Sequence, residues 1–292
     1  DNPEAFRAAV TDKTRAIFVE SLANPGGVIV DLEAIAKIAQ EAEVPLIVDN
    51  TMATPWLCRP FEWGADLVVH STTKFLSGQG NAMGGIVIDS GRFPWFGNAK
   101  YPSLSEPCPD YNGLTFAETF GDMAFTLYSH AVSLRDLGCT QSPMNAWITL
   151  NGVETLPLRM ERHVENAQKV AGFLQQHPSV EWVSYAGLSS SPYYQLAQKY
   201  LQGKAGSVFT FGIRGGYESG LRLLEKVELF SHVSNIGDSR SLILHPASTT
   251  HRQLSDEQRL TAGAGPEVIR LSVGIESAED LIADLEQALE GL

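Results

Sequence analysis

The chain has 292 residues, of which 43% are hydrophobic and 19% charged, and its formal net charge at pH 7 is −13. This composition allows a sizeable core and argues against disorder, and the acidic balance argues against nucleic acid or an anionic membrane as a partner. No apolar run approaches the roughly 18 residues of a membrane span. The three cysteines include no Cys-x-x-Cys pair, which argues against a disulfide framework or structural zinc and favours a reducing cytoplasm.

Four short apolar runs mark the first ninety residues, at 16–21, 45–50, 65–71 and 84–89. Residues 31–43 have apolar positions at helical spacing, with Asp31 as the expected N-cap. Near-continuous apolar runs joined by helices or crossovers are typical of a parallel sheet that is covered on both faces. The sequence therefore predicts an α/β domain with a mainly parallel sheet.

The rest of the chain is predicted as a long ordered loop, two helical stretches and a smaller α+β unit. The loop occupies 90–114, and the helical stretches occupy 116–137 and 142–175, with Pro157 kinking or restarting the second. In the last third, strands are expected at 180–185, 207–213, 241–245 and 268–273, and helices at 216–226 and 278–289. These patterns predict one domain over 1–150 and a second over 151–292.

Polar residues follow the first apolar runs, where ligands bind in open α/β sheets. They are Asn24, Asp49, Ser71, Thr73 and Lys74. Each has an ordinary explanation alone, as a cap, a turn residue or a surface lysine. Together they suit pyridoxal 5′-phosphate (PLP), a cofactor that requires an amine for its Schiff base and an acid at its pyridine nitrogen.

The chemistry of these side chains suggests a role for each of them. An ionised Asp49 keeps the pyridine nitrogen protonated by placing a negative charge beside it. Ser71 and Thr73 can donate hydrogen bonds to the phosphate. Partial desolvation beside a cationic ring would lower the pKa of Lys74 and keep its amine useful as a nucleophile and base.

A further candidate, Arg270, interrupts the apolar strand at 268–273. Such an arginine either faces solvent, pairs with an acid, or clamps a substrate carboxylate with its guanidinium fork. His245 and His251 lie in the companion stretch 237–251, but no third ligand has suitable spacing, so no metal site is predicted.

These stretches resemble the Cys/Met-metabolism family of PLP-dependent enzymes. The matching segments occur in the family's order, and they lie at 20–25, 48–51, 70–75, 241–251 and 269–276. The resemblance implies the aspartate-aminotransferase-like fold (fold type I), with a large PLP-binding domain and a smaller C-terminal α+β domain.

The resemblance also implies the role of each candidate. Lys74 forms the Schiff base and shuttles protons, Asp49 pairs with the pyridine nitrogen, and Ser71 and Thr73 bind the phosphate. The substrate α-carboxylate is bound by Arg270, helped by Asn24 and the backbone near Ser241.

Within the family, the segments at 109–114, 134–138 and 152–163 and the long loop resemble the O-acetylhomoserine sulfhydrylase subgroup. This implies γ-replacement, in which O-acetyl-L-homoserine and sulfide (or methanethiol) give homocysteine (or methionine) and acetate. Two alternatives on the same scaffold are a methionine γ-lyase and a cystathionine synthase or lyase. A catalytically silent structural subunit is the alternative from another class.

Family members are typically dimers or tetramers with shared sites, so a homo-oligomer is expected. They carry a segment ahead of the point where this sequence starts, with a Gly-containing phosphate loop, a tyrosine that stacks on PLP and a Tyr-x-Arg arm. No stretch of this sequence matches it. The resemblance therefore implies that a separate chain supplies this segment or that it lies outside this sequence.

Overall fold

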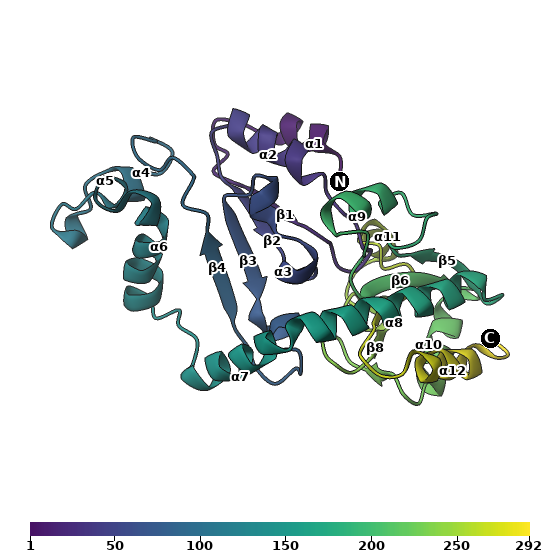
Figure 1. Ribbon diagram of the computed structural model, residues 1–292. Coiled ribbons are helices and arrows are strands. Elements are labelled where there is room, and N and C mark those ends of the chain that lie inside the picture. The colour runs from purple at the N-terminus through teal and green to yellow at the C-terminus, as the bar shows by residue number, and fades with distance from the viewer.

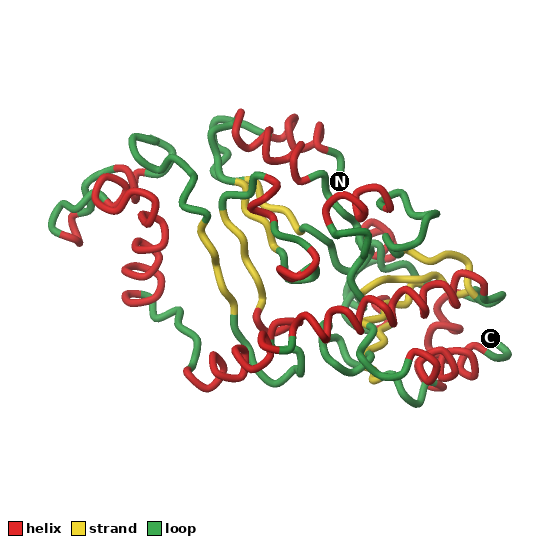
Figure 2. The backbone as a smooth tube through the Cα atoms, in the orientation of Figure 1, coloured by secondary structure: helices red, strands yellow, loops and turns green.

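Two β-sheets joined by a long helix organise the computed structural model, which describes residues 1–292 (Figures 1 and 2). The first sheet has the strand order β1-β2-β3-β4, and the second has the order β5-β6-β9-β8-β7. In Figure 1 the long helix, α8 (Leu156–Gln176), extends from the first sheet across the second.

The first sheet is parallel in three of its strands. β1 (Ile17–Glu20), β2 (Leu46–Asp49) and β3 (Leu67–Ser71) pair in parallel, which confirms a mainly parallel sheet. β4 (Gly85–Asp89) pairs with β3 in the antiparallel sense, whereas the sequence predicted four parallel runs. A parallel crossover usually needs a full helix. The connection at 72–84 contains a single helical turn, so the chain returns beside β3 in the opposite direction.

Helices α1 (Pro3–Ala9) and α2 (Leu32–Glu41) lie together at one side of the first sheet (Figure 1). α2 begins where the sequence predicts, because the side chain of Asp31 accepts the backbone N–H of Ala34 at 3.2 Å. Its buried apolar face packs on β2 and consists of Leu32, Ile35, Ile38 and Ala39. α3 (Thr54–Leu57) is a single turn after β2.

The middle of the chain lies beyond β4, at the left of Figure 1. It contains α4 (Pro102–Ser105), α5 (Phe116–Phe120), α6 (Ala124–Tyr128) and a π-helical segment at Ser129–Asp136. The helix predicted over 116–137 is therefore interrupted, because Gly121 adopts a φ of +54° and starts a 3₁₀ turn. This region has its own apolar cluster, consisting of Phe93, Trp95, Leu104, Phe116, Ala117 and Ala124.

The predicted break near Pro157 is present. α7 (Pro143–Glu154) ends at Thr155, and α8 begins at Leu156 with Pro157 in its first turn. Proline is tolerated there because its missing N–H would have no intrahelical partner at that position.

The second sheet is mostly antiparallel, and it contains the four strands expected from the sequence. These are β5 (Val180–Ser184), β6 (Val208–Ile213), β8 (Leu242–Leu244) and β9 (Val268–Ser272). The expected helices are α10 (Gly216–Lys226) and α12 (Ala278–Leu289). The sequence did not predict β7 (Ser231–His232), α9 (Tyr194–Tyr200) or α11 (Asp256–Thr261).

One cluster of 50 buried residues draws on both sheets and on α8. The predicted domain boundary at residue 150 falls inside α7, and the division into two domains stays a prediction. No helix combines the length and the apolarity that crossing a membrane requires.

Candidate active site

The carboxyl ends of β1, β2 and β3 meet at one edge of the first sheet and form a pocket of about 180 Å³. The pocket is lined by four of the residues that the sequence predicted, namely Asn24, Asp49, Ser71 and Lys74. The other lining residues are Glu20, Leu22, Thr51, Met52 and Ile236.

Lys74 lies in a distorted helical turn, Thr72–Leu76, that follows β3 directly. Its own backbone departs from helical geometry, with φ −92° and ψ −127°. The side chain is half-buried, and Nζ donates to Asn235 Oδ1 at 2.6 Å. Burial lowers the pKa of Lys74, and the positive charge of Arg270 lowers it further. The amine therefore loses its proton closer to neutral pH than an ordinary lysine does, as nucleophilic and proton-transfer chemistry requires.

Asp49 ends β2, and its Oδ1 accepts the backbone N–H of Thr51 at 2.9 Å. Such a bond is typical of a turn residue, which was the ordinary explanation for Asp49 in the sequence. Asp49 makes this bond and also lines the pocket. The charge of Asp49 affects the pKa values of two neighbours, Glu20 and His70. Burial is the main cause of the raised pKa of Glu20, and Asp49 adds to it. Burial lowers the pKa of His70, and Asp49 opposes that shift.

The two hydroxyl residues after β3 differ in their surroundings. Ser71 lines the pocket, and its backbone N–H donates to Thr51 Oγ1 at 2.8 Å. The hydroxyl of Thr73 instead donates to the carbonyl of Gly84 at 3.2 Å and accepts the N–H of Gly84 at 3.1 Å. Thr73 thus pins the Lys74 turn to the start of β4, and its hydroxyl is already paired within the protein.

Arg270 lies on β9, and its side chain extends to Asn24 at the pocket. Its guanidinium donates to the carbonyls of Ser234 at 3.0 Å and Asn235 at 3.2 Å, and it lies 3.5 Å from Asn24 Oδ1. Burial lowers the pKa of Arg270 below its ordinary value. A half-buried guanidinium without a carboxylate partner, next to the pocket lysine, is suited to an anionic group of a ligand.

Ser241 lies apart from this cluster. It is fully buried, and its backbone N–H and hydroxyl donate to the carboxylate of Glu276 at 2.7 and 2.9 Å. The hydroxyl also accepts the N–H of Gly274 at 2.8 Å, and the carbonyl accepts the N–H of Ser231 at 2.9 Å. Each polar group of Ser241 thus has a partner inside the fold, and a role of the nearby backbone in substrate binding stays a prediction.

Asn235, six residues before Ser241, is a residue of this stretch that contacts the candidate site. It bonds Lys74 through its side chain and Arg270 through its carbonyl. The sequence signal was slight, since Asn235 follows no predicted strand. Its position within a few residues of the 241–251 motif was the one available hint.

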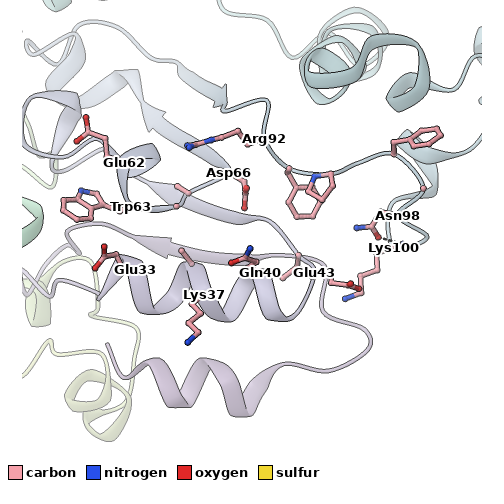
Figure 3. Close-up of a pocket in the computed structure, with 18 of the residues that line it drawn as sticks. Glu33, Lys37, Gln40, Glu43, Glu62, Trp63, Asp66, Arg92, Asn98 and Lys100 are labelled. Atoms are coloured by element: carbon pink, nitrogen blue, oxygen red, sulfur yellow. Dashed lines mark hydrogen bonds between the residues drawn. The ribbon is translucent and has the colours of Figure 1, made fainter.

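A much larger cleft, of about 960 Å³, lies at the opposite edge of the first sheet (Figure 3). It opens between α2 and the loop at 92–100, and its charged lining residues include Lys37, Asp66, Arg92 and Lys100. None of the residues singled out from the sequence lines it. The candidate reactive groups therefore lie in the smaller of the two pockets.

Close packing of α7 holds the Lys74 turn in place, and a glycine makes it possible. A Cβ at Gly152 would come closer than 3.0 Å to the carbonyl oxygens of Leu76 and Ser77. We expect Gly152→Ala to destabilise the protein by about 1–3 kcal/mol, as overpacking does. Gly172→Ala in α8 is the matched control, because its Cβ would meet nothing within 4 Å. It should stabilise by about 0.5–1 kcal/mol. Urea unfolding measures both, and equal effects would contradict the packing argument.

His163 makes stability depend on pH. It is fully buried; its Nδ1 donates to the carbonyl of Val273 at 2.7 Å and its Nε2 has no partner, so the ring is neutral. Burial lowers the pKa of His163 to about 4 from an ordinary value of 6.5. The unfolded chain therefore binds the proton first, and stability present above pH 6.5 is lost as the pH falls toward 4. The loss is at most roughly 3 kcal/mol.

The variant His163→Gln carries no titrating ring, so its stability should fall less between pH 7 and pH 4 than that of the unmodified protein. Thermal unfolding across this range measures the difference. The control is His130→Gln, which removes an exposed ring and should follow the unmodified protein. Parallel pH curves for all three proteins would contradict the assignment.

The chain matches a known protein family over almost its whole length. The profile of the Cys/Met metabolism PLP-dependent enzyme family matches residues 1–290. O-acetyl-L-homoserine sulfhydrylase of Leptospira meyeri is 50% identical over 100% of this chain and 68% of its own length. O-acetyl-L-homoserine sulfhydrylase 1 of Thermus thermophilus is 50% identical over 99% and 69%. Homocysteine synthase of Schizosaccharomyces pombe is 44% identical over 99% and 68%.

The architecture agrees with these relatives. A solved Campylobacter jejuni protein, assigned to the O-acetylhomoserine (thiol)-lyases, matches with a TM-score of 0.95 and 42% identity over 100% of this chain and 69% of that one. Its structure contains N'-pyridoxyl-lysine-5'-monophosphate. The match over nearly all residues, together with the lysine, carboxylate and hydroxyl in one pocket, identifies the chain as a member of the Cys/Met-metabolism family of PLP-dependent enzymes.

Proposed function

We propose that the protein is a PLP-dependent transferase that replaces the acetate of O-acetyl-L-homoserine with sulfide or methanethiol, giving homocysteine or methionine. The observation that carries this is the convergence of Lys74, Asp49 and Ser71 on one pocket with Arg270 beside it. The names of the relatives in Leptospira, Thermus and fission yeast support the substrate and the reaction type.

The residues present fit PLP. Lys74 offers a partly desolvated amine for covalent attachment, Asp49 offers a carboxylate for the pyridine nitrogen, and Ser71 offers a hydroxyl for the phosphate. Thr73 supports this arrangement through its two bonds to Gly84. When bound, PLP withdraws electrons from the substrate, which makes proton removal at Cα and then Cβ accessible at neutral pH.

The remaining steps belong to side chains of this chain. Arg270 and the amide of Asn24 bind the substrate α-carboxylate and hold Cα near Lys74. Lys74 Nζ would take the proton from Cα, because its lowered pKa leaves a larger part of the amine neutral than in an ordinary lysine. Asn235 keeps that amine aimed at the pocket through its 2.6 Å bond. Removal of a second proton, from Cβ, would let acetate leave from Cγ. After sulfide adds at Cγ, protons would return to Cβ and Cα, and homocysteine would be released.

The competing readings are a lyase on the same scaffold and a silent subunit. The names of the relatives favour replacement over hydrolysis to a 2-oxo acid, and none of those given above is a lyase acting on methionine or cystathionine. The pocket with Lys74 and Asp49 in place argues against a silent subunit.

We further propose that the protein acts in the cytoplasm as a homo-oligomer, a dimer or tetramer. The location is supported by three free thiols, Cys58, Cys108 and Cys139. Assembly is supported by large apolar side chains exposed on α7, which are Met144, Trp147, Leu150 and Val153. Light scattering after size-exclusion chromatography measures the assembly.

The decisive experiment incubates the protein and PLP with O-acetyl-L-homoserine, with and without sulfide, and identifies the products by mass spectrometry. Homocysteine formed only with sulfide is the expected result. A 2-oxo acid in both reactions would overturn the proposal in favour of a lyase. A folded, PLP-loaded protein that yields no product would favour the silent subunit.

A further inference from the structure

A buried arginine of α8, Arg159, holds the segment that follows Lys74. It is only 8% exposed. Its Nη1 donates to the carbonyl of Phe75 at 2.8 Å, and its Nη2 donates to the carbonyls of Gly152 at 2.6 Å and Leu76 at 3.5 Å. One guanidinium therefore binds the backbone on both sides of the interface between the Lys74 turn and α7.

The side chain of Arg159 is fixed from behind as well. Its Nε donates to the hydroxyl of Thr155, which immediately precedes α8, at 3.2 Å. No carboxylate pairs with the charge, and burial lowers the pKa of Arg159. Burying an unpaired cation is costly. Carbonyl dipoles of three residues offset that cost here, so the arrangement is specific to the conformation of the turn.

The turn needs an outside donor because it does not continue as a regular helix. It is a π-type turn with non-helical angles at Lys74, and Gly78, two residues after its last residue, has a φ of +76°. Carbonyls at the end of a helix have no intrahelical donor. Arg159 supplies donors to the carbonyls of Phe75 and Leu76, and Gly78 leaves it room, because a Cβ there would come closer than 3.0 Å to Nη1.

We propose that Arg159 is a positioning residue for the reaction. It binds the carbonyls directly after Lys74 and so keeps the lysine amine pointing into the pocket. The inference rests on the proposed function of Lys74. Arg159 does not line the pocket and touches Lys74 only through this backbone.

A purely structural role can be told apart because the pKa of Lys74 reports its position. That pKa is lowered by burial and by Arg270, whereas Arg159 lies behind the turn and contributes no direct charge effect. Replacing Arg159 therefore changes the pKa of Lys74 only if the lysine moves. Movement toward water would raise it, since burial is the larger cause of the depression.

The test compares Arg159→Met and Arg159→Lys with Arg162→Met, which removes an exposed arginine three residues along α8. In cofactor-free protein, Lys74 is labelled with an amine-directed reagent across a pH series, and its peptide is quantified by mass spectrometry. We expect the labelling midpoint of Arg159→Met to move to higher pH. Its kcat should fall about 100-fold with little change in KM, as for a misplaced catalytic group.

Arg159→Lys keeps the charge but cannot bind several carbonyls in the same geometry, so an intermediate midpoint and kcat are expected. Arg162→Met should behave as the unmodified protein. If Arg159→Met fails to fold, Thr155→Val, which removes only the partner of Nε, should move the midpoint in the same direction by less. An unchanged midpoint and kcat in folded variants, even with a lower melting temperature, would overturn the inference.

These outcomes are separable from a failure of the proposed function. If Lys74→Ala were fully active, Lys74 would not be the reactive amine, whatever the labelling of the Arg159 variants. If Lys74→Ala is inactive while Arg159→Met keeps the labelling midpoint and kcat of the unmodified protein, the positioning inference alone fails.

Discussion

Lys74→Ala is expected to abolish homocysteine formation while leaving the fold intact. The side chain makes one hydrogen bond, to Asn235, and is only half-buried, so its loss removes little packing. Proton transfer by a positioned side chain contributes about 10²–10⁴-fold to a rate. The loss of covalent attachment adds to that, so activity should fall by at least this factor.

Product formation from O-acetyl-L-homoserine and sulfide, followed by mass spectrometry, measures the effect, and circular dichroism checks the fold. The matched control is Lys37→Ala, which removes a lysine of α2 in the cleft at the opposite edge of the sheet. It should leave turnover unchanged. Full activity of Lys74→Ala would remove the central element of the proposed mechanism.

Arg270→Leu should produce the second large effect. Removing one partner of a buried, hydrogen-bonded charge pair costs about 2–5 kcal/mol, which corresponds to a loss of roughly 30- to 4,000-fold in kcat/KM. The loss is expected because the substrate α-carboxylate would have no guanidinium to bind. Arg270→Lys should fall between, since an ammonium cannot make the bidentate contact.

The same substitution has a second signature. The charge of Arg270 lowers the pKa of Lys74, so Arg270→Leu should raise that pKa, and the lysine should become neutral only at higher pH. Amine labelling of cofactor-free protein across a pH series measures the shift. Arg252→Leu, which removes an exposed arginine, is the control. A pKa of Lys74 that stays unchanged in Arg270→Leu would show that the two charges do not interact.

Much of the architecture was predictable because local sequence patterns carry it. The apolar runs of β1, β2 and β3, the N-cap Asp31 and the break at Pro157 all depend on neighbours within a few residues. The grouping of Asp49, Ser71 and Lys74 was predictable for a related reason. The carboxyl ends of parallel strands lie at one edge of a sheet, so residues after successive strands become neighbours.

Contacts between distant segments were decided by the tertiary structure. β4 runs antiparallel because the connection after Lys74 is too short for a crossover helix, and the apolar pattern of a strand does not encode its direction. The sequence predicted Thr73 as a hydroxyl donor to the phosphate and the backbone near Ser241 as part of the substrate site. In the fold the hydroxyls of Ser241 and Thr73 are paired with Glu276 and Gly84, because the nearest backbone and carboxylate groups compete with any ligand.

The sequence by itself determined the fold class, the strand-end lysine and carboxylate, and the family. The tertiary structure decided that Asn235 bonds Lys74, that Arg270 lies beside Asn24, and that Arg159 binds the turn from behind. These partners are separated from each other by 84 to 246 residues along the chain. Side chains so far apart meet only when the second sheet and α8 pack on the first, and no local pattern records that packing.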